Sequence, residues 1–327
     1  MSVNLLGKIC FRMRRACNQS HRYDFTVSDE LASTVSGPIA LEPLDGTVFD
    51  PCIVRRGTGL AIVYSDRVHG SLVEARSSDG VVWGDFSTLL KGGTDPCSWD
   101  SVVNRGCLSE RCGRRYLWFT GQNDRSSSIG LAIDDGCGFR RAKEAPVLSS
   151  SDTSYDAFMN PCVLWDEISS RWRMWFSAGE QYEPDVILHA WSDDGLRWNL
   201  DDAPVFSKNR EGCDSSKVGA CDIVQVPWQP GYFMFYIGYQ NIDVSRICAA
   251  WSPDGIRSWK RFALNPIVAP EHGSWARDSV YKPAVYVPQD PEGETWIWFN
   301  GRRAGDERIG RAVIRNTRQL FDLRYYR

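Results

Sequence analysis

The chain has 327 residues, of which 43% are hydrophobic and 24% are charged, a composition typical of a folded globular protein. Its net charge of −3 gives no overall electrostatic basis for binding nucleic acid or an anionic membrane. No run of apolar residues approaches the roughly 20 of a membrane-spanning helix, so we expect no transmembrane segment. These properties leave the oligomeric state open.

Residues 1–35 are predicted to form a partly disordered basic leader. They lack the apolar region of a secretory signal peptide, so we do not interpret them as one. The 11 cysteines show no Cys-x-x-Cys spacing, and most lie in apolar runs. We interpret them as reduced thiols of a cytoplasmic protein.

Residues 36–327 carry a repeated unit, and we expect them to form one domain. An Asp-Gly turn recurs roughly every 60 residues, at Gly80, Gly136, Gly195 and Gly255. Upstream of each turn lies an aromatic strand, and this strand occurs five times, at 60–67, 116–123, 173–180, 232–240 and 296–303.

A third repeated element is an aspartate followed by an apolar strand. Its copies begin at Asp100, Asp156, Asp214 and Asp278, and the first unit has Asp45 or Asp50 instead. Four antiparallel strands per unit, five units and no helical periodicity predict an all-β, five-bladed β-propeller. The last unit lacks the Asp-Gly turn, and residues 37–43 are predicted to supply its fourth strand and close the ring.

In such a ring, the residues before each inner strand and after each aromatic strand meet at one face. A cluster of carboxylates there raises some pKa values, which suits acid–base cleavage of a glycosidic bond. The predicted catalytic residues are Asp50, Asp100, Asp156 and Glu180. The predicted substrate-binding residues are Asp66, Arg67, Gln122, Asn160, Asp214, Gln240, His272, Asp278, Lys282, Arg302 and Arg303.

The repeated aspartates also allow a purely architectural interpretation, in which each one caps its strand or binds backbone amides. The residues unique to one blade are therefore the more informative candidates. They are Asp50, Glu180, His272, Lys282, Arg302 and Arg303.

The units resemble the five-bladed propeller superfamily of glycoside hydrolase families 43, 32, 68 and 130. The resemblance covers roughly residues 37–316 and rests on KPAVYV…WIWFNGR, NPCVLW…RMWFSAGE…HAWSDDGLRW…APVF and GSWARDSVYKPAV. It implies Asp50, in its Asp-Pro context, as base or nucleophile, Glu180 as general acid, and Asp100 or Asp156 as modulator. The Arg-Asp-Pro and Glu-Cys motifs of family 32 are absent. Family 130 phosphorylases use one acid with a basic phosphate site, for which the candidates are Lys282, Arg302, Arg303 and His272.

The leading hypothesis is a carbohydrate-active enzyme, either a hydrolase or a phosphorylase, acting on an oligosaccharide or a smaller ligand. The alternatives are a non-catalytic sugar-binding propeller and an enzyme of other chemistry, for which a buried His–carboxylate pair at His69 or His272 would be the sign. We expect no required cofactor or metal, since the four histidines are scattered. A central cation held by oxygen ligands would be Ca²⁺.

Overall fold

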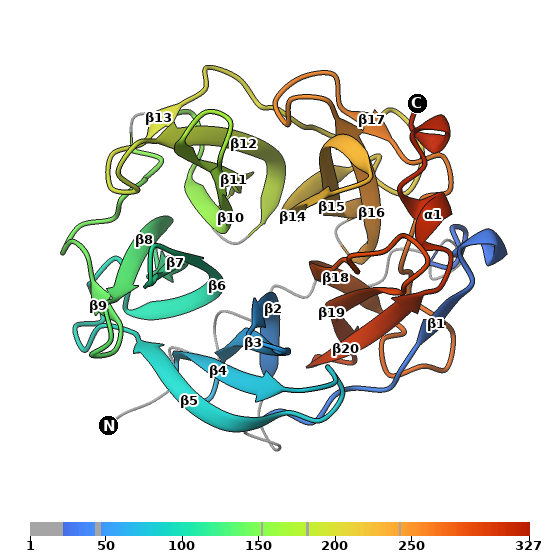
Figure 1. The fold of residues 1–327 in the computed structure, drawn as a ribbon. Helices are drawn as coiled ribbons and strands as arrows, with labels where there is room; N and C mark the ends of the chain where they lie inside the picture. The colour runs from blue at the N-terminus through green and yellow to red at the C-terminus, as the bar shows by residue number, and fades with distance from the viewer. Residues whose placement is uncertain (1–21, 43–46, 152, 181–182, 242) are drawn as a thin grey trace.

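The computed structural model describes residues 22–42, 47–151, 153–180, 183–241 and 243–327. Five four-stranded antiparallel sheets stand around a central axis, as Figure 1 shows. This arrangement confirms the predicted all-β, five-bladed propeller. The basic leader up to residue 21 lies outside the described residues.

Each blade runs from an inner strand at the axis to a short outer strand. Blade 1 has β2 (Val48–Arg56), β3 (Gly59–Asp66), β4 (Ser71–Ser77) and β5 (Gly84–Lys91). Blade 2 has β6 (Val102–Arg111), β7 (Arg114–Gln122), β8 (Ser127–Asp134) and β9 (Arg140–Arg141). Blade 3 has β10 (Ala157–Asp166), β11 (Arg171–Gly179), β12 (Pro184–Ser192) and β13 (Asn199–Leu200). Blade 4 has β14 (Lys217–Val226), β15 (Gln229–Asn241), β16 (Val244–Ser252) and β17 (Lys260–Arg261).

Blade 5 combines the two ends of the chain. Its inner strands are β18 (Ser279–Tyr286), β19 (Thr295–Arg303) and β20 (Asp306–Ile314), and its outermost strand is β1 (Ser33–Val35), which pairs antiparallel with β20. The prediction that residues 37–43 form this strand was therefore wrong in its position, since the segment follows β1. Its Ile39 N–H donates to the Ile309 carbonyl at 2.9 Å, as Ile267 N–H does to Ile247 at 2.7 Å in blade 4.

The helices are short. They are the 3-10 segments Asp29–Leu31 and Leu323–Tyr325 and α1 (Thr317–Leu320). None of the helices in the described part of the chain has the length and apolar character to cross a membrane.

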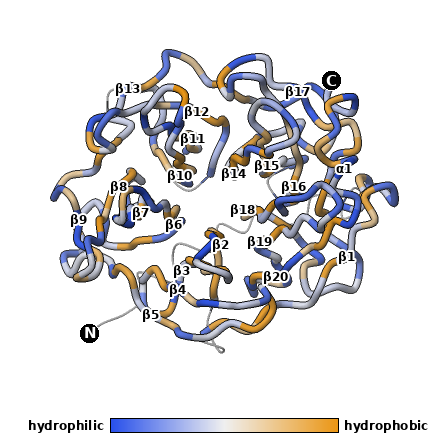
Figure 2. The backbone as a smooth tube through the Cα atoms, in the orientation of Figure 1, coloured by the Kyte–Doolittle hydropathy of each residue, from blue (hydrophilic) through white to orange (hydrophobic). Residues whose placement is uncertain are grey.

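The core consists of hydrophobic layers between neighbouring sheets, and Figure 2 shows hydrophobic stretches along the strands of every blade. The tryptophans of the second strands, Trp118, Trp175 and Trp298, are fully buried. Each contacts the Asp-Gly turn of the next blade: a Cβ on Gly80 would lie 3.0 Å from the Trp298 ring, and one on Gly255 would lie 3.0 Å from the Trp175 ring.

The Asp-Gly turns therefore do more than reverse the chain. Gly255 has φ of +74°, a conformation that glycine adopts readily, and its lack of a side chain leaves room for the indole. Trp175 Nε1 donates to the Gly255 carbonyl at 2.7 Å. Three of the four repeated turns, at Gly80, Gly195 and Gly255, thus take part in a contact between blades.

Candidate functional site

Each inner strand contains one β-bulge near its start, at the face of the ring that we call the top face. The bulge shifts the register against the second strand and gives one residue a positive φ between +25° and +59°. Bulges re-aim side chains and are frequent beside active sites. The five equivalent residues, here called the bulge ring, are Asp50, Arg105, Asn160, Ala220 and Lys282.

A side chain of the preceding blade holds the backbone of four bulge-ring residues. In each case the bulge N–H donates to an oxygen on the second strand of that blade. The pairs are Asp50 to Asn300 Oδ1 (3.0 Å), Arg105 to Ser65 Oγ (2.9 Å), Asn160 to Thr120 Oγ1 (3.0 Å) and Ala220 to Ser177 Oγ (2.8 Å). The ring is therefore positioned by contacts between blades.

Asp50 is the only carboxylate of the bulge ring, and it is 3% exposed. Its Oδ2 accepts no hydrogen bond from the described residues and lies 3.9 Å from Arg105 Nε. Burial raises the pKa of Asp50; the charges of Arg105 and Lys282 oppose this shift, and Glu307 adds to it. The result is a buried carboxyl group inclined to hold a proton, with one oxygen unengaged.

Glu307 lies in blade 5, at the start of β20, and is the second carboxylate near Asp50. Its side chain is 13% exposed; it receives a hydrogen bond from the Tyr281 hydroxyl and pairs with Arg67 at 2.7 Å. A hydroxyl donor and a guanidinium therefore both contact the Glu307 carboxylate. Asp50 and Glu307 therefore have contrasting surroundings within one charged cluster.

Tyr239 of blade 4 belongs to the same cluster. Burial raises the pKa of Tyr239 to about 12, and the charges of Arg105, Arg302, Glu183 and Asp50 also act on it. Since these charges come from blades 1, 2, 3 and 5, the phenol lies close to the axis. The cluster thus draws on all five blades at the top face.

Below Asp50, a second layer of residues surrounds the axis. Cys52, Cys107 and Cys162 occupy equivalent positions in blades 1–3, and blade 4 has Asp222 there. Each side chain accepts the N–H of a neighbouring inner strand, as Asp222 Oδ2 does from Val285 at 2.7 Å. Burial raises the pKa of Asp222 to about 6.

Lys282 is 4% exposed and connects the two layers. Burial lowers the pKa of Lys282, but the charges of Asp50, Cys52 and Asp222 outweigh this effect and raise it. The Lys282 ammonium and the Asp50 carboxyl group therefore act on each other within the bulge ring.

Three of the predicted aspartates are engaged in ion pairs and hydrogen bonds, two of them within their own blades. Asp100 pairs with Arg141 of β9 at 2.5 Å and accepts a hydrogen bond from Ser98. Asp214 pairs with Arg261 of β17 at 2.7 Å and accepts a hydrogen bond from Tyr236. Asp278 binds Arg22 at 2.8 Å and accepts the Ala304 N–H. These contacts match the architectural interpretation of the repeated aspartates.

The remaining predicted residues occupy varied environments. Asp156, Glu180, His272 and Arg303 are exposed, and His272 lies against the Tyr23 ring. Four other predicted residues bind side chains or backbone groups near them. Asp66 binds His69 at 2.6 Å, and Gln122 binds Asn104 and Ser127. Gln240 accepts a hydrogen bond from Arg246, and Arg302 donates one to the Asp243 carbonyl. Only Asp50, Arg67, Asn160, Lys282 and Arg302 belong to the bulge ring or its charged cluster.

Arg105, Tyr239, Tyr281 and Glu307 were not among the predicted site residues. One signal for Arg105 exists in the sequence: Asp50, Asn160 and Lys282 each precede a proline within an inner strand, and Arg105 has the same position before Gly106. No local pattern marks Glu307, which reaches the site only through the fold.

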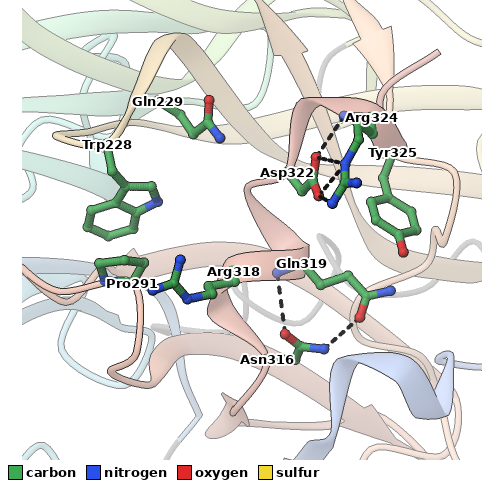
Figure 3. Close-up of a pocket in the computed structure, with 9 residues that line it drawn as sticks. All are labelled: Trp228, Gln229, Pro291, Asn316, Arg318, Gln319, Asp322, Arg324 and Tyr325. Atoms are coloured by element: carbon green, nitrogen blue, oxygen red, sulfur yellow. Dashed lines mark hydrogen bonds and ion pairs between the residues drawn. The ribbon is translucent and has the colours of Figure 1, made fainter.

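The pocket in Figure 3 lies on the opposite face, beside the turns that follow β14 and β18. It has a volume of about 520 Å³ and is lined by Trp228, Pro291 and residues of the C-terminal segment. Several of its polar groups already bind each other, as Asp322 does Arg324 and Asn316 does Gln319. Within the described residues, no group of three or more His, Cys, Asp or Glu side chains is arranged to hold a metal ion.

Residues 68–230 match the profile of the glycosyl hydrolases family 32 N-terminal domain. A solved glycoside hydrolase is similar at 18% identity and a TM-score of 0.68, covering 86% of this chain and 91% of that one. A structure from the GH130 family of mannoside phosphorylases, which contains glycoside hydrolases that target β-1,2 mannosidic linkages in Candida mannan, shares 15% identity over 82% and 84% of the chains with a TM-score of 0.61. An N-acetylgalactosamine deacetylase from F. plautii, in complex with blood group B trisaccharide, shares 16% identity over 89% and 98% with a TM-score of 0.66. No curated protein sequence matches significantly.

Proposed function

We propose that this chain, which belongs by fold to the five-bladed propeller glycoside hydrolases, cleaves a glycosidic bond at the top face with Asp50 as its general acid. The observation that carries the proposal is the environment of Asp50. Its carboxyl group is buried, its pKa is raised, and its Oδ2 is free of hydrogen bonds from the described residues. A raised pKa favours the protonated form of a carboxyl group, and this form can protonate a leaving oxygen.

Glu307 is the second carboxylate in this proposal. Glycoside cleavage pairs a protonated acid with a charged carboxylate that activates water or stabilises the developing positive charge on the sugar. The Tyr281 hydroxyl and the Arg67 guanidinium contact Glu307 and fix the position of its side chain. In the reaction, the Asp50 proton passes to the leaving glycosidic oxygen, and Glu307 takes a proton from the attacking water.

The proposal moves the catalytic roles away from Asp100, Asp156 and Glu180. The Asp100 carboxylate is engaged by Arg141 and Ser98, so a proton on it would break an internal ion pair. Asp156 and Glu180 are exposed, and neither belongs to the bulge ring or to its charged cluster. The bulge ring itself has Asn160 and Ala220 in blades 3 and 4, which carry no acid.

The substrate class is a saccharide. Tyr239 offers an aromatic surface near the axis, and the arginines and amides of the cluster offer hydrogen bonds to hydroxyl groups. The neighbouring structures include glycoside hydrolases and a deacetylase in complex with a trisaccharide, which supports this class. We place the reaction in the cytoplasm, because all nine described cysteines are free thiols.

The test is a set of matched variants assayed on 4-nitrophenyl glycosides and on oligosaccharides with product chromatography. Asp50→Asn and Glu307→Gln are expected to lower kcat/KM by roughly 10²- to 10⁴-fold on any substrate that the wild type cleaves. Asp156→Asn and Glu180→Gln, which change exposed carboxylates, are expected to leave kcat/KM within about threefold. Full turnover by Asp50→Asn would remove Asp50 from the mechanism.

A phosphorylase is the second candidate, favoured by the cations Arg105 and Lys282 beside Asp50. The same assay, repeated with inorganic phosphate, separates the two reactions: a phosphorylase releases a sugar phosphate and depends on the anion, whereas a hydrolase releases the free sugar without it. A saccharide-dependent rise in melting temperature with no product would instead indicate a binding protein.

A further inference from the structure

Two buried cysteines contact each other inside blade 4. Cys213 lies in the loop that leads into β14 and is 5% exposed, and Cys248 lies in β16 and is fully buried. Their Sγ atoms are 3.0 Å apart, within roughly 1 Å of the ~2.05 Å length of a disulfide bond. Both are free thiols in this structure.

Blades 2 and 5 have a different pair of residues at this location. In blade 2, Trp99 of the lead-in loop packs on Gly130 of β8, where a Cβ would lie 2.5 Å from the indole. Blade 5 repeats the arrangement with Trp275 on Gly310, where the distance would be 2.2 Å. Gly130, Gly310 and Cys248 are equivalent, since they pair with Phe119, Phe299 and Tyr236 in the second strands.

Blade 4 therefore has two thiols where blades 2 and 5 have tryptophan on glycine. The second strand of blade 4 has a glycine, Gly238, beside this pair of thiols. A Cβ on Gly238 would lie 3.0 Å from Cys248 Sγ and 2.8 Å from Asp214 Cβ. In blades 2 and 5 the indole fills the space between the lead-in loop and the sheet. The two thiols of blade 4 are smaller and fill less of this space. A covalent bond would restore the attachment.

We propose that Cys213 and Cys248 are an oxidative modification site, at which a peroxide converts the two thiols into a disulfide that fastens the lead-in loop of blade 4. This inference is independent of the proposed glycosidase activity.

The reaction has two steps. The Cys213 sulfur attacks the peroxide oxygen, the O–O bond breaks, and a sulfenic acid and water form. Cys248 then attacks that sulfur, its proton leaves with the departing hydroxyl as a second water, and the S–S bond closes. Burial and the neighbouring Cys213 raise the pKa of Cys248. Cys213 is 5% exposed whereas Cys248 is fully buried, so Cys213 is the thiol that the peroxide reaches first.

The fastened loop carries two contacts of the top face. Asp214, next to Cys213, binds Arg261 at 2.7 Å and Tyr236 at 2.9 Å. Lys217, at the start of β14, pairs with Glu183 at 3.1 Å. A bond at Cys213 therefore restrains the segment that brings blade 4 to the axis.

The test begins with the folded full-length chain. N-ethylmaleimide first blocks the exposed thiols, which include Cys97, Cys112 and Cys137. Hydrogen peroxide is then added, the chain is unfolded, and the remaining thiols are labelled with a heavier maleimide before digestion and mass spectrometry. We expect a Cys213–Cys248 linked peptide and the loss of two late-labelled thiols.

The melting temperature gives a second readout. The 35-residue spacing of the two cysteines predicts a rise of roughly 5–10 °C on oxidation, reversed by a thiol reductant. Cys213→Ser is expected to show neither the linked peptide nor the rise. Recovery of both cysteines with the late label after peroxide treatment of the wild type would overturn the proposal, whatever the variant does.

Discussion

Replacing Ser177 by alanine tests the contact that positions the bulge ring. The Ser177 Oγ is fully buried; it accepts the Ala220 N–H at 2.8 Å and the Asn160 Nδ2 at 3.2 Å. Ala220 is 1% exposed, so without this acceptor its N–H is left buried and unpaired. Such a group costs about 1–3 kcal/mol of stability, which is the loss expected for Ser177→Ala.

The assay is urea unfolding followed by fluorescence of the 14 tryptophans. We expect a lower urea midpoint with an unchanged m-value, because the variant alters stability and not the surface exposed on unfolding. Ser78→Ala changes an exposed serine and is the control, expected within about 0.5 kcal/mol of the wild type. A loss for Ser177→Ala no larger than that of the control would refute the account of the bulges.

Three further predictions concern other parts of the molecule. Gly310→Ala would place a Cβ 2.2 Å from an indole carbon and should lower stability by about 1–3 kcal/mol, whereas Gly37→Ala, with no atom within 4 Å, should be neutral in the same urea titration. Asp100→Asn should lower the melting temperature and leave kcat/KM per folded molecule unchanged, and a kcat/KM loss like that of Asp50→Asn would restore Asp100 as a catalytic residue. Burial raises the pKa of Asp222 to about 6, above its unfolded value, so its stabilising contribution is present below about pH 4 and lost as pH rises through 6. Unfolding free energies between pH 4 and pH 7 should therefore fall less steeply for Asp222→Asn than for the wild type, and parallel profiles would contradict this.

The blades were predictable because their signals are local. An Asp-Gly turn, an aromatic strand and a lead-in aspartate recur with similar spacing, and several copies of each make the same contact in different blades. The packing of Trp175 on Gly255 and the ion pair of Asp214 with Arg261 are two such contacts. Repetition therefore revealed the architecture.

The candidate site was only partly predictable. Asp50 was visible through its Asp-Pro context, but the bulge that aims it depends on Asn300, 250 residues away in the chain. Glu307 reaches Asp50 because blade 5 stands beside blade 1, and nothing in its local sequence marks it. The lead-in aspartates looked like a ring of carboxylates, whereas Asp100 and Asp214 are tied to arginines of their own outer strands.

Asp50 and Glu307 at the top face are proposed to carry out the chemistry. A crystal structure with a non-hydrolysable thio-oligosaccharide tests this proposal most directly. The account predicts the sulfur that replaces the glycosidic oxygen within hydrogen-bonding distance of Asp50 Oδ2, with Glu307 on the other side of the sugar ring. A saccharide bound instead in the pocket beside Trp228 and Tyr325, with the top face empty, would contradict it.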